Sequence, residues 1–262
     1  MDALVAPGSP QTPQAINANL TGWDPVFERV EGTRLDELHG CARRLTVVVR
    51  LPMFNSISGV PQGPDPDRAI DELLAPFEAE GLPLTWWVLD SNETAERLSS
   101  RGFEVESIPG MAADLSSLAA MHLPVGVTLR HVDDDKDALK TAMEIAFMMN
   151  GLPAEAATPL FEAYAEYPGR ETLLTFLVEV GGVPAATSTL FLNAGVAGIY
   201  SIGTLEEFRG KGLGTLVTLA AMQTARSVGY RVATLQSSPM GHSIYLKLGF
   251  VEHLSYTVAF RA

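Results

Sequence analysis

The sequence predicts an α/β or α+β protein with a mixed sheet, built in two similar halves. First, runs of β-branched and aromatic residues alternate with helical patterns along the chain, as in folds that layer helices on a sheet. Second, 262 residues suffice for two domains of about 100–150 residues each. Third, Leu-x-x-x-Gly-Phe at residues 98–103 returns as Tyr-x-x-x-Gly-Phe at residues 245–250, about half the chain later.

The first half is predicted to begin with a loose tail and to continue as strands and helices in turn. Residues 1–13 are rich in Pro, Gly and Ser, which disfavours regular structure. After them, hydrophobic runs predict strands, and polar runs bounded by Asp, Gly or Pro predict helices. The predicted strands cover residues 44–51, 84–89 and 103–115, and the predicted helices cover residues 67–80 and 92–100.

The second half follows the same rules. Gly181 and Gly182 predict a two-residue hairpin turn, because glycine tolerates positive φ. The predicted strands cover residues 127–132, 173–180, 183–193, 196–204, 232–237 and 251–260, and the predicted helices cover residues 136–150, 154–167, 212–228 and 241–248. A stretch of small residues before the first of these strands separates the halves. We therefore expect an N-terminal domain at residues 1–118, a linker at 119–126 and a C-terminal domain at 127–262.

Composition narrows the class of protein. The net charge of −13 argues against binding nucleic acid or an anionic membrane surface, since both need clustered Lys and Arg. The single cysteine, Cys41, excludes an intrachain disulfide and suits a reducing cytoplasm. No basic segment followed by an apolar core opens the sequence, and no apolar run approaches the roughly 20 residues that span a bilayer. We expect a cytoplasmic protein.

A glycine-rich loop carries the chemistry. Residues 209–214 (RGKGLG) lie between a predicted strand and a long predicted helix. There the unpaired backbone N–H groups and the positive end of the helix dipole hold phosphate oxygens, and glycines let the backbone approach the anion. The sequence therefore predicts a phosphate-binding site at this junction.

Residues 209–214 can be compared with three known patterns of phosphate-binding loop. The nucleoside-triphosphate loop needs Ser or Thr after its lysine, but Gly212 follows Lys211. The dinucleotide loop needs a third glycine where Val217 stands. The coenzyme A pyrophosphate loop, Arg/Gln-x-x-Gly-x-Gly/Ala, is matched in full by Arg209, Gly212 and Gly214.

With its surroundings, the loop resembles that of the GNAT superfamily of N-acetyltransferases. Residues 199–205 lie where that family's fourth strand lies, and residues 236–250 (QSSPMGHSIYLKLGF) resemble its fifth strand and next helix. The resemblance covers residues 126–260. It implies a tandem chain of two GNAT-like domains, each with a mixed, mostly antiparallel central sheet flanked by helices.

The resemblance also implies acetyl-CoA as co-substrate and no metal. In this family the fourth strand splays away from its neighbour and exposes backbone groups that pair with the pantetheine, while the loop takes the pyrophosphate. The residues expected to bind the cofactor are Ile202, Gly203, Thr204 and Leu205 on the strand, Arg209, Gly210, Lys211, Gly212, Leu213 and Gly214 in the loop, and Ser238.

The implied reaction is transfer of an acetyl group to a primary amine by direct attack on the thioester. Tyr245 matches the family's general acid, a phenol that donates a proton to the departing sulfur. Because Tyr245 shares an apolar helix face with Ile244 and Leu248, a role as a core aromatic is the alternative.

The general base is left open. Many relatives place a carboxylate on the fourth strand, but residues 196–205 contain none. Glu179, Glu206 and His242 are candidates, and so is a base that acts through water.

The first half is similar in outline but lacks the working parts. Residues 59–66, at the repeat distance before the loop, contain Gly59 and Gly63 but no basic residue, and Leu98 stands where Tyr245 stands in the second half. We therefore expect a degenerate GNAT-like domain that shapes the acceptor pocket or stabilises the other half.

Three functions compete at this point. The first is an acetyltransferase that acts on a small-molecule or protein amine. The second is an acyl-CoA-binding sensor or regulatory protein without turnover, which the missing strand carboxylate allows. The third is an interaction scaffold. A homodimer is compatible with all three.

Overall fold

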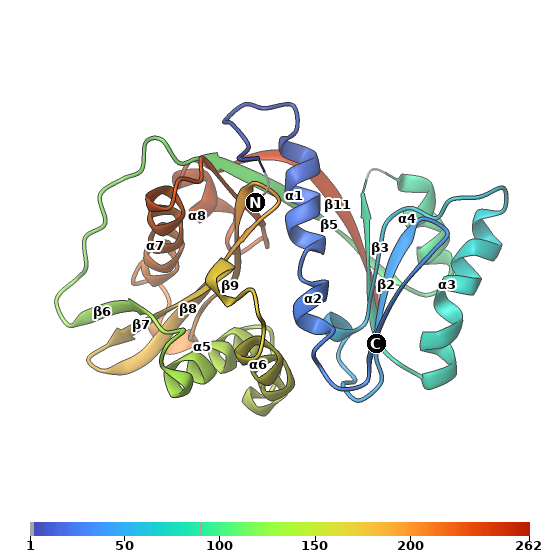
Figure 1. The fold of residues 1–262 in the computed structure, drawn as a ribbon, viewed down its shortest axis with the longest axis horizontal. Helices are drawn as coiled ribbons and strands as arrows, with labels where there is room; N and C mark the ends of the chain where they lie inside the picture. The colour runs from blue at the N-terminus through green and yellow to red at the C-terminus, as the bar shows by residue number, and fades with distance from the viewer. Residues whose placement is uncertain (1–2, 90) are drawn as a thin grey trace. The chain divides into compact units, whose positions relative to one another are not determined.

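The computed structural model describes residues 3–89 and 91–262, and the chain forms two compact units (Figure 1). Unit 1 combines Met1–Gly22 with Gly110–His253, and unit 2 combines Trp23–Pro109 with Leu254–Ala262. A search of the described helices finds none with the length and apolar character needed to cross a membrane.

Both ends of the chain lie outside the units that the sequence predicts for them. The sequence places residues 1–118 in one domain and residues 127–262 in the other, whereas the structure places residues 3–22 in unit 1 and residues 254–262 in unit 2. The N-terminal segment is not loose, because Val5 is buried and its N–H donates to the carbonyl of Gly195 at 3.0 Å. Residues 115–126, around the expected linker, contain no helix or strand.

The sheet of unit 1 is mixed and mostly antiparallel. Its strand order is β5-β10-β9-β8-β7-β6, with residues 110–114 of β5 in this unit. Only β9 and β10 pair in parallel. The strands are β5 (Glu104–Asp114), β6 (Val127–His131), β7 (Leu173–Val180), β8 (Val183–Asn193), β9 (Val196–Thr204) and β10 (Val232–Gln236). The predicted fold class, a mixed sheet flanked by helices, is confirmed.

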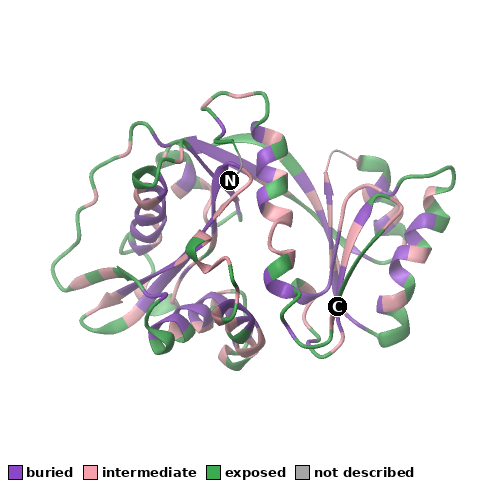
Figure 2. Ribbon diagram, viewed as in Figure 1, coloured by how far each residue is buried: buried purple, intermediate pink, exposed green. Residues whose placement is uncertain are grey.

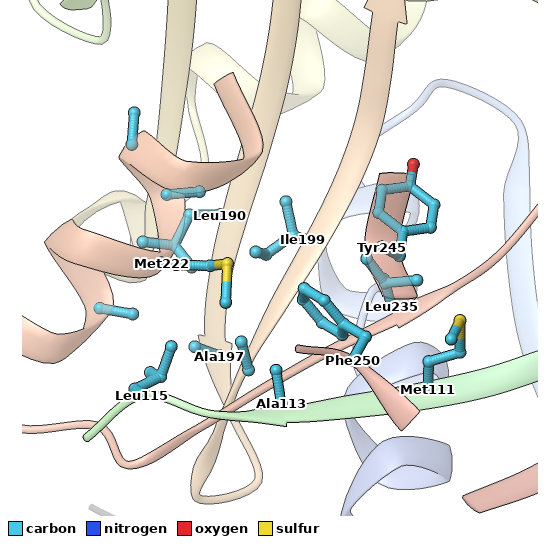
Figure 3. Close-up of a cluster of buried hydrophobic side chains, with 14 of the residues drawn as sticks. Met111, Ala113, Leu115, Leu190, Ala197, Ile199, Met222, Leu235, Tyr245 and Phe250 are labelled. Carbon is cyan, nitrogen blue, oxygen red and sulfur yellow. The ribbon is translucent and has the colours of Figure 1, made fainter. Parts of the chain in front are cut away.

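Helices cover both faces of this sheet (Figure 1). On one face lie α7 (Leu213–Ser227) and α8 (His242–Lys247), where Met222 of α7 joins Leu190 and Ile199 of the strands in a buried apolar cluster (Figure 3). On the other face lie α1 (Thr12–Thr21) and α5 (Lys136–Met149), followed along the chain by α6 (Thr158–Ala165). Short 3-10 helices occupy Ala154–Ala157, Arg170–Thr172 and Glu206–Phe208.

One buried side chain fastens α1 to the sheet. Asn19 is 0% exposed, and its Nδ2 donates to the carbonyls of Phe191, Asn193 and Val196 at 3.2, 2.9 and 3.3 Å. Its Oδ1 accepts a hydrogen bond from the Tyr200 hydroxyl at 2.6 Å. A buried amide is stabilising only when its polar atoms are paired in this way. Asn19 therefore ties the N-terminal helix to the β8–β9 hairpin.

Unit 2 has the strand order β1-β2-β3-β4-β11. Its core gathers Trp86 of β4 with Leu73 and Phe77 of α3, and Figure 2 shows the buried face of that helix. The strands are β1 (Thr33–Leu38), β2 (Cys41–Thr46), β3 (Ser56–Ser58), β4 (Leu84–Leu89) and β11 (Val251–Arg261), and the helices are α2 (Asp24–Phe27), α3 (Pro66–Glu80), α4 (Asn92–Ser100) and a 3-10 turn at Pro52–Phe54.

The strand predicted at residues 44–51 is wrong in position, because β2 ends at Thr46. The side chain of Asn55 takes the place of a strand partner there. Its Oδ1 accepts from the Thr46 N–H at 2.8 Å, and its Nδ2 donates to the Val49 carbonyl at 3.0 Å. The chain turns at this point although its residues are β-branched.

Candidate functional site

Strand β9 separates from β10 partway along its length. The two strands pair in parallel at Ala197 and Gly198, while β9 continues to Thr204 beside β8 alone. A bulge marks the separation, since the register leaves Ser201 and Ile202 opposite a single residue of β8. Ser201 has φ of +51°, an unusual value for a residue other than glycine that is found where a bulge redirects a strand. The end of β9 therefore presents backbone groups on the side that β10 leaves.

The glycine loop follows β9 and leads into α7. Gly210 and Gly212 both have φ of +76°, and Gly212 is the N-cap of the helix. An added Cβ at either position would meet no atom within 4 Å. The backbone conformation, and not lack of space, therefore requires glycine. The open space leaves the N–H groups of the first turn of α7 accessible to an anion.

A cavity of about 530 Å³ lies between β9, the loop and α8. Its walls come from four parts of unit 1: Met149 of α5; Ile202, Gly203 and Thr204 of β9; Arg209, Gly210, Gly212, Leu213, Gly214 and Thr215 of the loop and α7; and Ser238, Met240, Gly241, Ile244, Tyr245 and Lys247 around α8. The space thus joins the splayed strand to the anion site at the helix N-terminus.

The structure brings most of the predicted cofactor residues to this cavity. Leu205 and Lys211 are the exceptions among those named from the sequence. The N–H of Leu205 donates to the Ala185 carbonyl at 2.9 Å, which turns this residue toward β8. The Lys211 ammonium lies 4.9 Å from the centre of the Phe208 ring and donates to the Glu207 carbonyl at 3.4 Å. Lys211 therefore does not line the cavity.

Arg209 lies at the end of β9. Its Nε donates to the Thr204 carbonyl at 3.4 Å, and its Nη2 lies 3.9 Å from the Met149 sulfur. In the described part of the chain, no carboxylate forms an ion pair with it. A guanidinium in this position adds positive charge beside the loop and suits a phosphate.

Tyr245 takes part in both the core and the cavity wall. It is 7% exposed, and its ring meets that of Phe250 edge to face with centroids 5.9 Å apart. In Figure 3 its hydroxyl points away from Phe250 and Leu235. A Cβ at Gly241 would lie 2.6 Å from the Tyr245 ring, so a larger residue there would displace that ring. Burial raises the pKa of Tyr245 to about 12, so the hydroxyl keeps its proton at neutral pH.

None of the three candidate bases named from the sequence lines the cavity. Glu179 accepts from the Thr128 hydroxyl at 3.2 Å on the outer strands. His242 faces Glu252 at 3.3 Å. Glu206 is exposed in the 3-10 turn before the loop. The cavity wall holds no carboxylate among the described residues, so the base is still not assigned.

Several wall residues were not named from the sequence as cofactor ligands. Thr215, Met240, Gly241, Ile244 and Lys247 are in this group. Lys247 had a signal in the sequence, because it lies inside the Tyr-x-x-x-Gly-Phe motif. A search of the residues that the structure describes finds no cluster of three or more His, Cys, Asp or Glu arranged to hold a metal ion.

Comparisons with known proteins agree with this geometry. A model of the acetyltransferase (GNAT) family matches residues 140–250, which include α7, the loop, the splayed strand and α8. No curated protein matches the sequence significantly.

Solved structures share the fold across nearly the whole chain. A GCN5-related N-acetyltransferase from Kribbella flavida superposes with a TM-score of 0.68 at 22% identity, covering 94% of this chain and 95% of that one. A second, from Sphaerobacter thermophilus, has a TM-score of 0.59 at 18% identity, with 99% and 94% covered. A tandem GNAT protein from the clavulanic acid biosynthesis pathway has a TM-score of 0.61 at 13% identity, with 99% and 97% covered. Residues 140–250 therefore match the acetyltransferase (GNAT) family, and the chain shares its fold with GCN5-related N-acetyltransferases and with a tandem GNAT protein.

Proposed function

We propose that this protein is an acetyl-CoA-dependent N-acetyltransferase that transfers an acetyl group to a primary amine of a small molecule or a protein. The observation that carries the proposal is one cavity whose wall includes the splayed end of β9, the glycine loop at the start of α7 and Tyr245. The family match supports an acyltransferase, and the site supports the cofactor.

Two parts of the cavity wall suit two parts of acetyl-CoA, the pyrophosphate and the pantetheine. The loop offers the N–H groups of Gly212 to Gly214 and the Arg209 charge to the pyrophosphate. The backbone of Ile202 to Thr204, beyond the strand pairing with β10, suits the amides of the pantetheine. Such main-chain hydrogen bonds hold an extended ligand in the manner of an added strand.

In this proposal Tyr245 is the general acid. Attack of the amine nitrogen on the thioester carbonyl forms the C–N bond, the C–S bond breaks, and the sulfur leaves as a thiolate that needs a proton. A phenol whose pKa is raised to about 12 by burial holds that proton at neutral pH and donates it to sulfur. The proton of the amine passes to water or to a group of the acceptor, since the described cavity wall offers no carboxylate.

The proposal also includes the location of the protein, its partners and the role of unit 2. A cytoplasmic location suits the one cysteine, because Cys41 is buried and burial raises the pKa of its thiol to about 11, which keeps it protonated and unreactive. The charge of −13 disfavours nucleic acid and anionic membrane as partners and favours a cationic amine as acceptor. Unit 2 is proposed to be a degenerate GNAT-like domain.

A calorimetric titration with acetyl-CoA should give one site per chain. The reason lies in unit 2, where residues 59–66 hold no basic side chain and Leu98 is fully buried in the apolar core. Two sites would contradict the assignment of unit 2 as degenerate. No binding at millimolar ligand would overturn the proposed function. Binding without turnover on any amine would favour a sensor.

Two loop variants should remove most of the affinity for acetyl-CoA. Gly212→Asp forces a side chain onto a residue with φ of +76°, at a cost of about 1–3 kcal/mol, and places a carboxylate at the anion site. We expect an affinity loss of about 100-fold or more. Arg209→Ala removes a charge-assisted contact, and we expect a loss of about tenfold.

Lys211→Ala is the matched control for these variants. It removes a positive charge from the same loop, but this ammonium lies over Phe208 and outside the cavity wall. We expect its affinity to stay within about threefold of the parent, because exposed charges contribute little. If all three variants weaken binding equally, the loop acts only through its net charge and the proposed phosphate geometry is wrong.

A further inference from the structure

We propose that Lys247 binds the 3′-phosphate of coenzyme A, so that the site selects 3′-phosphorylated coenzyme A over its dephospho form. The inference rests on the proposed function and adds to it a second anion contact. It concerns the part of the cavity wall that α8 contributes.

The first observation is the placement of charge around the cavity. Arg209 and Lys247 are the cationic side chains in its wall, and they come from different elements. Arg209 belongs to the loop before α7, whereas Lys247 is the last residue of α8. The cavity wall therefore has cationic side chains from two elements, and the glycine loop accounts for one of them.

The second observation is that Lys247 has no ion-pair partner among residues 3–89 and 91–262. The chain has 31 acidic and 18 basic residues, and many of its arginines pair with carboxylates. Lys140 pairs with Glu144 at 3.9 Å. A lysine that stays unpaired beside a cavity in such an acidic chain is available to an anionic ligand.

The chemistry of coenzyme A supplies the anion. The molecule carries a pyrophosphate and, separately, a phosphate monoester on the ribose. The N–H groups at the start of α7 and Arg209 suit the pyrophosphate, because a helix N-terminus and a guanidinium both present several aligned donors. A monoester holds close to two negative charges at neutral pH. It suits a lysine, which is a compact point charge on a flexible stem.

The test compares coenzyme A with 3′-dephospho-coenzyme A by calorimetry on the full chain. We expect the parent protein to bind coenzyme A about tenfold more tightly than the dephospho form. We expect Lys247→Gln to abolish this preference, with affinity for the dephospho form within about twofold of the parent. Arg209→Ala should weaken both ligands by the same factor and leave the preference intact. Matching thermal unfolding curves check that Lys247→Gln is folded.

Three results would overturn the inference. The first is a parent protein that binds both ligands equally. The second is a Lys247→Gln variant that loses affinity for both ligands by the same factor, which would assign Lys247 to the pyrophosphate. The third is a variant that keeps the preference. If the parent binds neither ligand, the proposed function fails as well, and this result is distinct from the other three.

Discussion

Tyr245→Phe is expected to lower kcat by about 10²–10⁴-fold, the usual contribution of a general acid, while the dissociation constant of acetyl-CoA changes less than about threefold. Phenylalanine keeps the ring that packs against Phe250 and over Gly241, so only the hydroxyl is lost. The measurement is steady-state release of free thiol with an amine acceptor found by screening. Because the pKa of Tyr245 is about 12, its loss of a proton should not lower the rate below about pH 11.

The control for this variant is Tyr167→Phe. It makes the same chemical change in a tyrosine that does not line the cavity, and we expect the parent rate. A Tyr245→Phe enzyme with a rate within twofold of the parent would remove Tyr245 from the mechanism. A large loss of affinity with unchanged kcat would reassign it as a binding residue.

Asn19→Ala is expected to destabilise unit 1 by about 3 kcal/mol or more. It leaves the carbonyls of Phe191, Asn193 and Val196 and the Tyr200 hydroxyl without the Asn19 amide. Each buried polar group that loses its partner costs about 1–3 kcal/mol. Asn17→Ala is the matched control, since Asn17 lies on the same helix, is partly exposed and has no side-chain hydrogen bond in the described structure. We expect a change within about 0.5 kcal/mol for it.

Hydrogen exchange of the β8–β9 peptides is the measurement that isolates this effect. All three tryptophans, Trp23, Trp86 and Trp87, lie in unit 2, so tryptophan fluorescence does not report directly on unit 1. In Asn19→Ala the amides of β8 and β9 should exchange faster by two orders of magnitude or more, in line with the expected loss of stability. Equal exchange in the two variants would show that Asn19 contributes nothing to the hold on the hairpin.

The sequence was most informative where local pattern and tertiary structure agree. The bounds of β7, β8 and β9 match the prediction, because long apolar β-branched runs are separated by Gly181 and Gly182, which both adopt positive φ. Gly210 and Gly212, which the sequence singles out, both have φ of +76°, a conformation that glycine adopts without the steric cost of a Cβ.

The parts that the sequence missed depend on contacts distant along the chain. Helix α1 has only four buried residues, and the bonds that fix Asn19 reach more than 170 positions away. Strand β1 is largely exposed and charged, so no hydrophobic pattern identifies it. At the site, Lys247 lines the cavity because of the way α8 packs beside the glycine loop. The Tyr-x-x-x-Gly-Phe motif does not specify this packing. Neither a sequence motif nor the described cavity wall identifies a general base.

The N-terminal residues 3–22 belong to unit 1 and the C-terminal residues 254–262 belong to unit 2. This arrangement affects how the protein folds during synthesis. Unit 1 needs residues 3–22 and a segment that ends more than 200 residues later, and unit 2 needs β11, whose residues Tyr256 to Arg261 pair with β4. On the ribosome, the strands of unit 2 must wait for residues 254–262 to emerge before their sheet is complete. A fragment cut at the predicted linker would hold neither unit whole. Expression of either half alone should therefore yield an insoluble or unfolded product.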